Sequence, residues 1–103
     1  MLKPKAIVFG IGKRFSQFKS LISEEFNIIA LVDNDVSKIG TVVGGIEIAH
    51  PNTVTQIDCD IIIITTNIIS ILHQLISLGT SMDKIEPISK PPTDFTIYVP
   101  GAA

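Results

Sequence analysis

Two glycines close an apolar run near the start of the chain, in the order Ala6-Ile7-Val8-Phe9-Gly10-Ile11-Gly12. A strand that ends in glycines and turns into a helix brings backbone N–H groups and a helix N-terminus to one point, where a phosphate can bind. Lys13 and Arg14 follow in the predicted first helical turn and can pair with phosphate or carboxylate oxygens. We therefore predict an anion site formed by Gly10, Ile11, Gly12, Lys13 and Arg14. The alternatives are a tight turn that binds nothing and a pair of solvated surface charges.

A carboxylate stands at the end of the second apolar run. Asp33 lies 21 positions after Gly12, the distance at which dinucleotide-binding βαβ units hold ribose hydroxyls. We include Asp33 and the adjacent Asn34 in the predicted site. The alternative is structural, because Asp33, Asn34 and Asp35 are all residues that form turns by bonding to their own backbone.

Polar side chains also follow the most apolar run of the sequence, residues 61–64. Thr65, Thr66 and Asn67 offer hydroxyl and amide groups. If this run is a strand parallel to the first, its carboxyl end lies beside Gly10, and these three residues lie at the mouth of the same crevice. The alternative for each of them is simple capping of the helix that follows.

The dinucleotide fingerprint calls for a third glycine three positions after Gly12, and Phe15 stands there instead. A ring at this packing position pushes the helix outward. That weakens the case for a complete NAD but leaves the helix N-terminus available to a phosphate.

The remaining chemistry-bearing residues predict neither catalysis nor a metal site. His50 and His73 have no partner at ligand spacing, and Cys59 between Asp58 and Asp60 has no adjacent general base. The only tyrosine, Tyr98, is not followed by the lysine of a Tyr-x-x-x-Lys pair. We expect no catalytic residue and no metal ligand, and binding rather than turnover by this chain alone.

The hydrophobic pattern of the chain predicts strands that alternate with helices. Strands are predicted at residues 5–10, 27–33, 46–48, 61–65, 85–88 and 95–99, and helices at 13–25, 51–56 and 68–78, with one turn at 37–40. This alternation predicts an α/β, three-layer Rossmann-like fold with a mainly parallel sheet, strand order 3-2-1-4-5, and the strand at 46–48 at an edge.

Length, charge and composition limit the function classes. At 103 residues the chain is expected to form a Rossmann-like nucleotide-binding domain over residues 1–90, with a C-terminal extension over 91–103 that adds one edge strand and a free tail. A net charge of −2 argues against nucleic-acid binding, and no apolar run is long enough to span a bilayer. One cysteine and no signal peptide predict a cytoplasmic protein. Abundant isoleucine predicts a homo-oligomer or a partner enzyme.

Several segments together resemble one protein family. They are Ala6 to Gly12, Leu31-Val32-Asp33-Asn34-Asp35 with Ser37-Lys38-Ile39-Gly40, Gly45-Ile46-Glu47-Ile48, Ile62-Ile63-Ile64-Thr65-Thr66 and Leu78-Gly79. The chain resembles, roughly from Lys5 to Ile88, the Rossmann-like N-terminal domains of bacterial polysaccharide-biosynthesis enzymes. Those domains precede the catalytic parts of nucleotide-sugar 4,6-dehydratases and sugar O-acyltransferases. The resemblance implies a nucleotide or nucleotide-sugar pocket in which Gly10, Gly12 and Asp33 match the glycine turn and the acidic strand end.

These observations lead to one hypothesis and two alternatives. The chain is expected to be a non-catalytic domain that binds a nucleotide or a UDP-type nucleotide sugar and is linked to polysaccharide biosynthesis. The first alternative is an assembly module whose pocket has degenerated. The second is an NAD(P)-binding fragment of a dehydrogenase or dehydratase.

Overall fold

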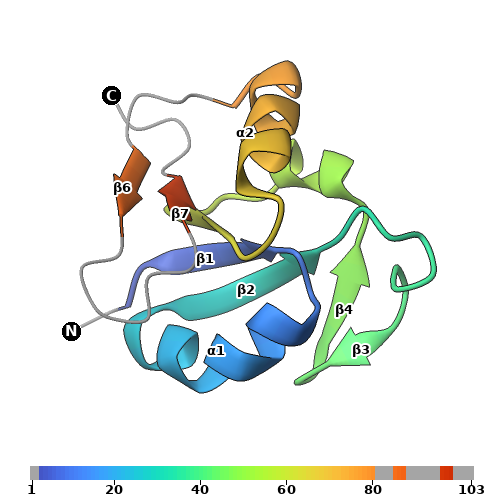
Figure 1. Ribbon diagram of the computed structural model, residues 1–103. Coiled ribbons are helices and arrows are strands. Elements are labelled where there is room, and N and C mark those ends of the chain that lie inside the picture. The colour runs from blue at the N-terminus through green and yellow to red at the C-terminus, as the bar shows by residue number, and fades with distance from the viewer. Residues whose placement is uncertain (1–2, 81–84, 88–95, 99–103) are drawn as a thin grey trace.

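The computed structural model describes residues 3–80, 85–87 and 96–98 (Figure 1). The elements, in chain order, are β1 (Lys5–Phe9), α1 (Lys13–Glu25), β2 (Asn27–Val32), β3 (Val42–Val43), β4 (Ile46–Ala49), the 3-10 helix η1 (Pro51–Gln56), β5 (Ile61–Ile64), α2 (Ile68–Ser77), β6 (Ile85–Pro87) and β7 (Thr96–Tyr98). The predicted α/β class is confirmed.

Four parallel strands form the centre of the sheet. β1 pairs in parallel with β2 on one side and with β5 on the other, and β2 pairs in parallel with β4. Residues Ala6 to Phe9 and Ile62 to Ile64 have no exposed surface. Burial of this kind explains why both runs are apolar without alternation, as parallel strands covered on both faces require.

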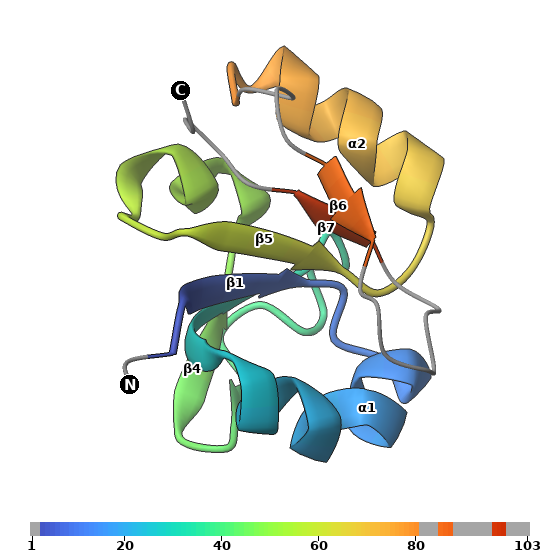
Figure 2. The ribbon, with the colours of Figure 1, turned by 90° about the vertical axis from the view of Figure 1, so that its left-hand side faces the viewer.

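The sheet lies between two helical layers, with α1 on one face and α2 and η1 on the other (Figures 1 and 2). Successive residues of β1 contribute to opposite faces. Ala6 and Val8 belong to the core cluster under α1, whereas Ile7 and Phe9 belong to the cluster under α2. The period of two along a strand therefore divides one apolar run between two cores.

Helix α1 buries Phe15, Phe18 and Ile22 against the first of these cores, and α2 buries Ile71 and Leu75 in the second. Both sets follow the three- and four-residue spacing of an amphipathic helix. Gly79, just beyond α2, has a φ of +91°. It stands at the position where the sequence predicts the helix to stop, and glycine is the residue that adopts this conformation most readily.

The strand order differs from the predicted 3-2-1-4-5. Within the described residues, the sheet has seven strands in the order β3-β4-β2-β1-β5-β7-β6. The four parallel strands keep the relative order 3-2-1-4, but β7 lies between β5 and β6, so the predicted fifth strand does not pair with the fourth. β7 is antiparallel to both of its neighbours, and the sheet is parallel only at its centre.

Two predicted edge positions are also wrong. β4 is not at the edge, because the two-residue strand β3 pairs with it in antiparallel register, Val42 opposite Glu47 and Val43 opposite Ile46. The C-terminal strand that was expected at an edge is β7, which is internal to the sheet. The strands β3 and β7 contain only two and three residues. Such short segments carry too little hydrophobic pattern to specify which strand they pair with. The predicted free tail lies outside the described residues.

The two faces of α2 provide a test of this packing. Ile71 is 3% exposed and Ile69, two residues earlier on the same helix, is 72% exposed. We expect Ile71→Ala to lower the free energy of unfolding by about 2–4 kcal/mol, because it leaves a cavity in the core. Ile69→Ala is expected to change it by less than about 0.5 kcal/mol. Urea denaturation followed by circular dichroism measures both, and equal losses would contradict the packing described.

Candidate functional site

A cleft of about 700 Å³ opens at the carboxyl end of the parallel strands. It lies between the β1–α1 turn, the loop after β2 and the loop that joins β5 to α2. Its lining residues are Ile11, Gly12, Lys13, Arg14, Gln17, Asp33, Lys38, Thr65, Thr66 and Asn67. This is the edge of a parallel sheet at which ligands bind in open α/β folds.

Gly10 directly follows β1 and has a φ of +104°, a backbone conformation that other residues rarely adopt. A β-carbon at this position would lie 2.6 Å from Thr65 Oγ1 and 2.8 Å from Thr66 Cγ2. The Thr65 hydroxyl is buried and donates to the carbonyl oxygens of Phe9 and Gly10. The end of β1 is thus fastened to the end of β5, and only glycine fits between them.

Asp33 holds the two loops at the floor of the cleft together. Its Oδ2 accepts the Ile11 N–H at 2.7 Å, and its Oδ1 accepts the Asp35 N–H at 2.8 Å. Lys38 Nζ donates to the Ile11 carbonyl at 2.9 Å and lies 3.9 Å from Asp33 Oδ2. The predicted structural alternative for Asp33, a turn former, is therefore realised. Because a carboxylate has about four acceptor sites, two bonds still leave capacity for a ligand hydroxyl.

Both helices that begin at the cleft have uncapped N-termini. In the described part of the chain, no side chain caps α1 at Gly12 or α2 at Asn67, and neither first turn contains an acidic residue. By contrast, the nearby η1 is capped by His50, whose Nδ1 accepts the Asn52 N–H. Uncapped helix N-termini carry partial positive charge and orphan N–H donors that suit an anion.

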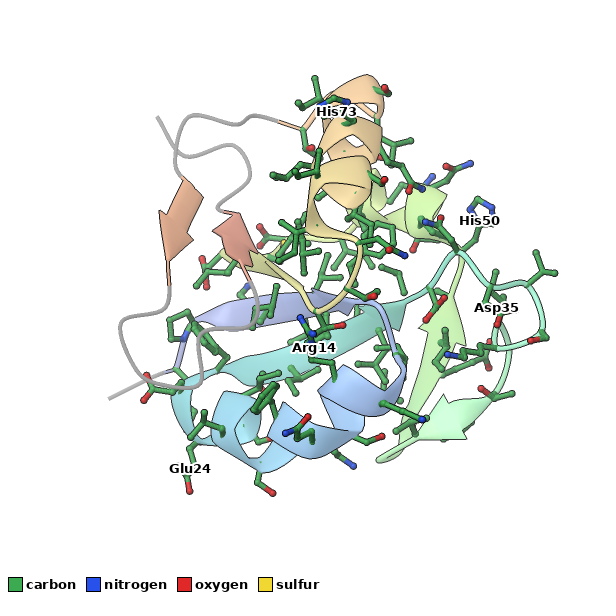
Figure 3. All side chains as sticks on the ribbon, in the orientation of Figure 1. Arg14, Glu24, Asp35, His50 and His73 are labelled. Carbon is green, nitrogen blue, oxygen red and sulfur yellow. The ribbon has the colours of Figure 1, made fainter. Side chains whose placement is uncertain are left out.

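Three cationic side chains line the same cleft, together with a single carboxylate. Lys13 and Arg14 belong to the first turn of α1, Lys38 follows β2, and the carboxylate is that of Asp33. Figure 3 shows Arg14 extending from α1 toward the loop between β5 and α2. Arg14 and Asn67 also line a smaller pocket beside the cleft. The cleft is therefore positive in a chain whose net charge is −2.

Eight of the ten predicted site residues line the cleft. The exceptions are Gly10, which lies beneath it, and Asn34, whose amide exchanges two 2.8 Å hydrogen bonds with that of Gln74 on α2. The alternative for Thr65, Thr66 and Asn67, that one of them caps α2 through its side chain, is not met, because no side-chain cap bond from a described residue is present at the start of α2. The Thr65 hydroxyl bonds to β1 instead, and Asn67 is at the cap position with a left-handed backbone and no side-chain cap bond.

Two lining residues were not predicted, Gln17 and Lys38. Gln17 lies four positions after Lys13 in a predicted helix, so the helical period places it on the same face. Lys38 lies in the Ser37-Lys38-Ile39-Gly40 segment and reaches Ile11 across a sequence distance of 27 residues. No local pattern in the sequence specifies that contact.

The isolated reactive residues lie away from the cleft. His50 and His73 are exposed on separate elements (Figure 3). Across the described residues there is no group of three or more potential metal ligands.

Asp35 accepts the Ser37 hydroxyl and N–H, and these bonds lower the pKa of its carboxyl. None of the described helices has the length and apolar character needed to cross a bilayer.

Comparison with known sequences identifies the family. The family described as C2185-like, N-terminal matches residues 2–86. The chain belongs to this family. No curated protein with a similar sequence was found. Among solved structures, the C2185-like chain is similar to UDP-D-quinovosamine 4-dehydrogenase from Vibrio fischeri, with 18% identity and a TM-score of 0.48 over 75% of this chain and 89% of that one.

The Gly10 contact in this C2185-like chain can be tested against a second left-handed glycine. Gly40 has a φ of +93°, but a β-carbon there would have nothing within 4 Å. We expect Gly40→Ala to lower the free energy of unfolding by about 1–2 kcal/mol through backbone strain alone. Gly10→Ala should cost about 1–3 kcal/mol more, because the methyl group also collides with Thr65 and Thr66. Chemical denaturation measures both, and equal losses would show that the collision is relieved without cost.

The thiol of Cys59 provides a pH-dependent test. Burial, followed by the negative charges of Asp60 and Asp58, raises the pKa of Cys59 to about 11. We expect alkylation by iodoacetamide at pH 8 to be roughly a hundredfold slower than in urea-unfolded protein, and to accelerate as the pH rises toward that pKa, since the thiolate is the reactive form. A native rate equal to the unfolded rate would contradict the burial of this residue.

Proposed function

We propose that the chain binds a nucleoside diphosphate, either as a free nucleotide or as a UDP-type nucleotide sugar, and does not itself catalyse a reaction. The observation that carries this proposal is the convergence of three cations and two uncapped helix N-termini on one cleft of about 700 Å³. A diphosphate carries the charge and the number of acceptor oxygens that such a cleft favours. A volume of this size also leaves room for a nucleoside or a sugar.

The parts of the ligand can be assigned to parts of the cleft. Lys13, Arg14 and the first turn of α1 are suited to the diphosphate. Asp33, at the floor of the cleft, is suited to the ribose hydroxyls, because its carboxylate accepts hydrogen bonds and would repel a 2′-phosphate. Thr66 and Asn67, both exposed at the opposite wall, provide polar contacts for the remainder of the ligand.

The residue types at the cleft support binding without turnover. Among the described residues, the lining contains one carboxylate and no histidine, cysteine or tyrosine. Asp33 and Lys38 both bond to the Ile11 backbone, which favours a structural role for this pair over general acid–base chemistry. A link to polysaccharide biosynthesis is supported by the motif resemblance over residues 5–88, and a separate catalytic partner is part of this proposal.

The proposal predicts that a uridine nucleotide stabilises the protein and that Lys13 is needed for it. UDP at 100 times its dissociation constant should raise the free energy of unfolding by ~2.7 kcal/mol. We expect Lys13→Gln to weaken UDP binding about tenfold, because it removes a charge-assisted contact to phosphate. Lys19→Gln, on the same helix but outside the cleft lining, is the matched control and should bind UDP as the parent does.

Isothermal titration with UDP, UDP-N-acetylglucosamine, NAD(H) and NADP(H) is the measurement. Failure of all four to bind at millimolar concentration would overturn the proposal. Tight binding of NAD(H) with no response to UDP would favour the dinucleotide alternative instead.

An assembly module remains the second candidate, and one observation favours it. Val36, Val42 and Ile69 are 79%, 64% and 72% exposed, which is high for large apolar side chains. Sedimentation analysis over a wide concentration range tests it, since a strictly monomeric protein would contradict a self-assembly role.

A further inference from the structure

A second cavity, of about 460 Å³, lies on the α1 face of the sheet and shares no lining residue with the cleft. It is bounded by α1, the start of β2 and the β3–β4 hairpin, which lies beside α1 in Figure 1. Its lining residues are Lys3, Phe15, Lys19, Ser23, Phe26, Asn27, Ile28, Leu31, Val43, Gly44 and Ile46.

The floor of this cavity is apolar and partly aromatic, whereas its rim is polar. Phe15, Phe26 and Leu31 are buried, and all three belong to the core cluster under α1. Ile28, Val43 and Ile46 are half-buried and pack against the same cluster. The cavity thus opens onto the edge of a core, and an apolar body placed there would cover its half-buried aliphatic side chains from water.

The rim of the cavity carries positive charge only. Lys3 and Lys19 are its charged residues among those that the structure describes, and no described aspartate or glutamate lines it. The Lys3 amine donates to the Ser23 carbonyl at 2.8 Å. Lys19 is half-buried, and its amine lies only 2.9 Å from where a β-carbon on Gly44 would stand. Gly44, in a left-handed conformation with a φ of +57°, therefore leaves the space in which this amine sits.

The amine of Lys19 has no acceptor among the described residues. Lys19 takes part in neither of the ion pairs Lys5–Asp58 and Lys38–Asp33, and no hydrogen bond of its amine is present within the described residues. Lys19 is half-buried at the edge of the cavity, so an anion that entered the cavity would give its amine a charged partner in place of water. Ser23 and Asn27 add a hydroxyl and an amide to the same lining.

We propose that this cavity binds a small aromatic carboxylate, with its ring against Phe15 and Phe26 and its carboxylate at Lys19. The ring is favoured by the two phenylalanines and the aliphatic residues around them, and the single compact anion by the lysine rim. The volume is within the range of small-molecule sites. Phe15 replaces the third glycine of the dinucleotide fingerprint. In this proposal its side chain contributes to the second cavity and not to the cleft.

The test uses 1-naphthoate as the probe and two-dimensional amide NMR of the whole chain. We expect 1-naphthoate to shift the amides of Ser23, Gly44 and Ile46 and to leave those of Gly12 and Thr66 unchanged. The neutral 1-naphthalenemethanol, which has a ring of the same size, should bind at least fivefold more weakly, because it does not provide the anion. This comparison requires no variant, so it stands even if a substitution impairs folding.

Variants then assign the charge. Lys19→Met keeps most of the side-chain stem and removes the amine, and we expect it to weaken 1-naphthoate binding about five- to tenfold. Lys13→Gln, in the cleft, is the matched control and should leave 1-naphthoate binding unchanged while it weakens UDP binding. The two sites can thus fail independently.

Three results would overturn the inference. The first is equal affinity for 1-naphthoate and 1-naphthalenemethanol, and the second is a set of shifts confined to the cleft. The third is a change of the cavity amides with protein concentration in the absence of any probe, which would make the cavity a contact between two copies of the chain.

Discussion

The burial of residues 6–9 of β1 and 62–64 of β5 is the constraint on which the rest of the structure depends. Both strands are apolar on both faces, so helices must cover both sides of the sheet. Crossover connections satisfy that requirement and keep the strands parallel, which brings their carboxyl ends to one edge. The cleft forms at that edge because the segments that follow β1, β2 and β5 meet there and line it.

The close approach of β5 to β1 then determines the shape of the cleft floor. The buried Thr65 hydroxyl satisfies carbonyl oxygens at the end of β1, and Gly10 provides the space for it. Asp33 and Lys38 complete the floor by bonding to the N–H and the carbonyl of Ile11. Side chains that are expected to contact a ligand therefore also hold the loops in place, so substitutions of Asp33 or Lys38 affect stability and binding together. Lys13, at the exposed start of α1, separates the two effects better.

Charge is distributed unevenly over this small molecule. The net charge is −2, yet the cleft and the second cavity are both lined by more basic than acidic residues. The cleft is polar and combines cations with helix N-termini, whereas the second cavity combines two lysines with an apolar interior. Phe15 belongs to the interior of that cavity, and its ring occupies the packing position at which a dinucleotide-binding unit has glycine. Phe15 thus stands in place of the third glycine of the dinucleotide fingerprint and also lines the second cavity.

The sequence by itself determined the α/β class, the helix at 13–25, the helix predicted at 68–78 that ends one residue earlier at Ser77, the central parallel strands and most of the cleft lining. Each of these depends on local signals, namely apolar runs, helical periodicity and glycines that follow strands, which a single segment carries in full. The tertiary structure alone decided the strand β3, the antiparallel position of β7 between β5 and β6, the bond between Lys38 and Ile11, and the pairing of Asn34 with Gln74 rather than with the cleft. These features require two segments that are distant in the sequence to meet, and short strands and polar side chains carry too little local pattern to specify their partners.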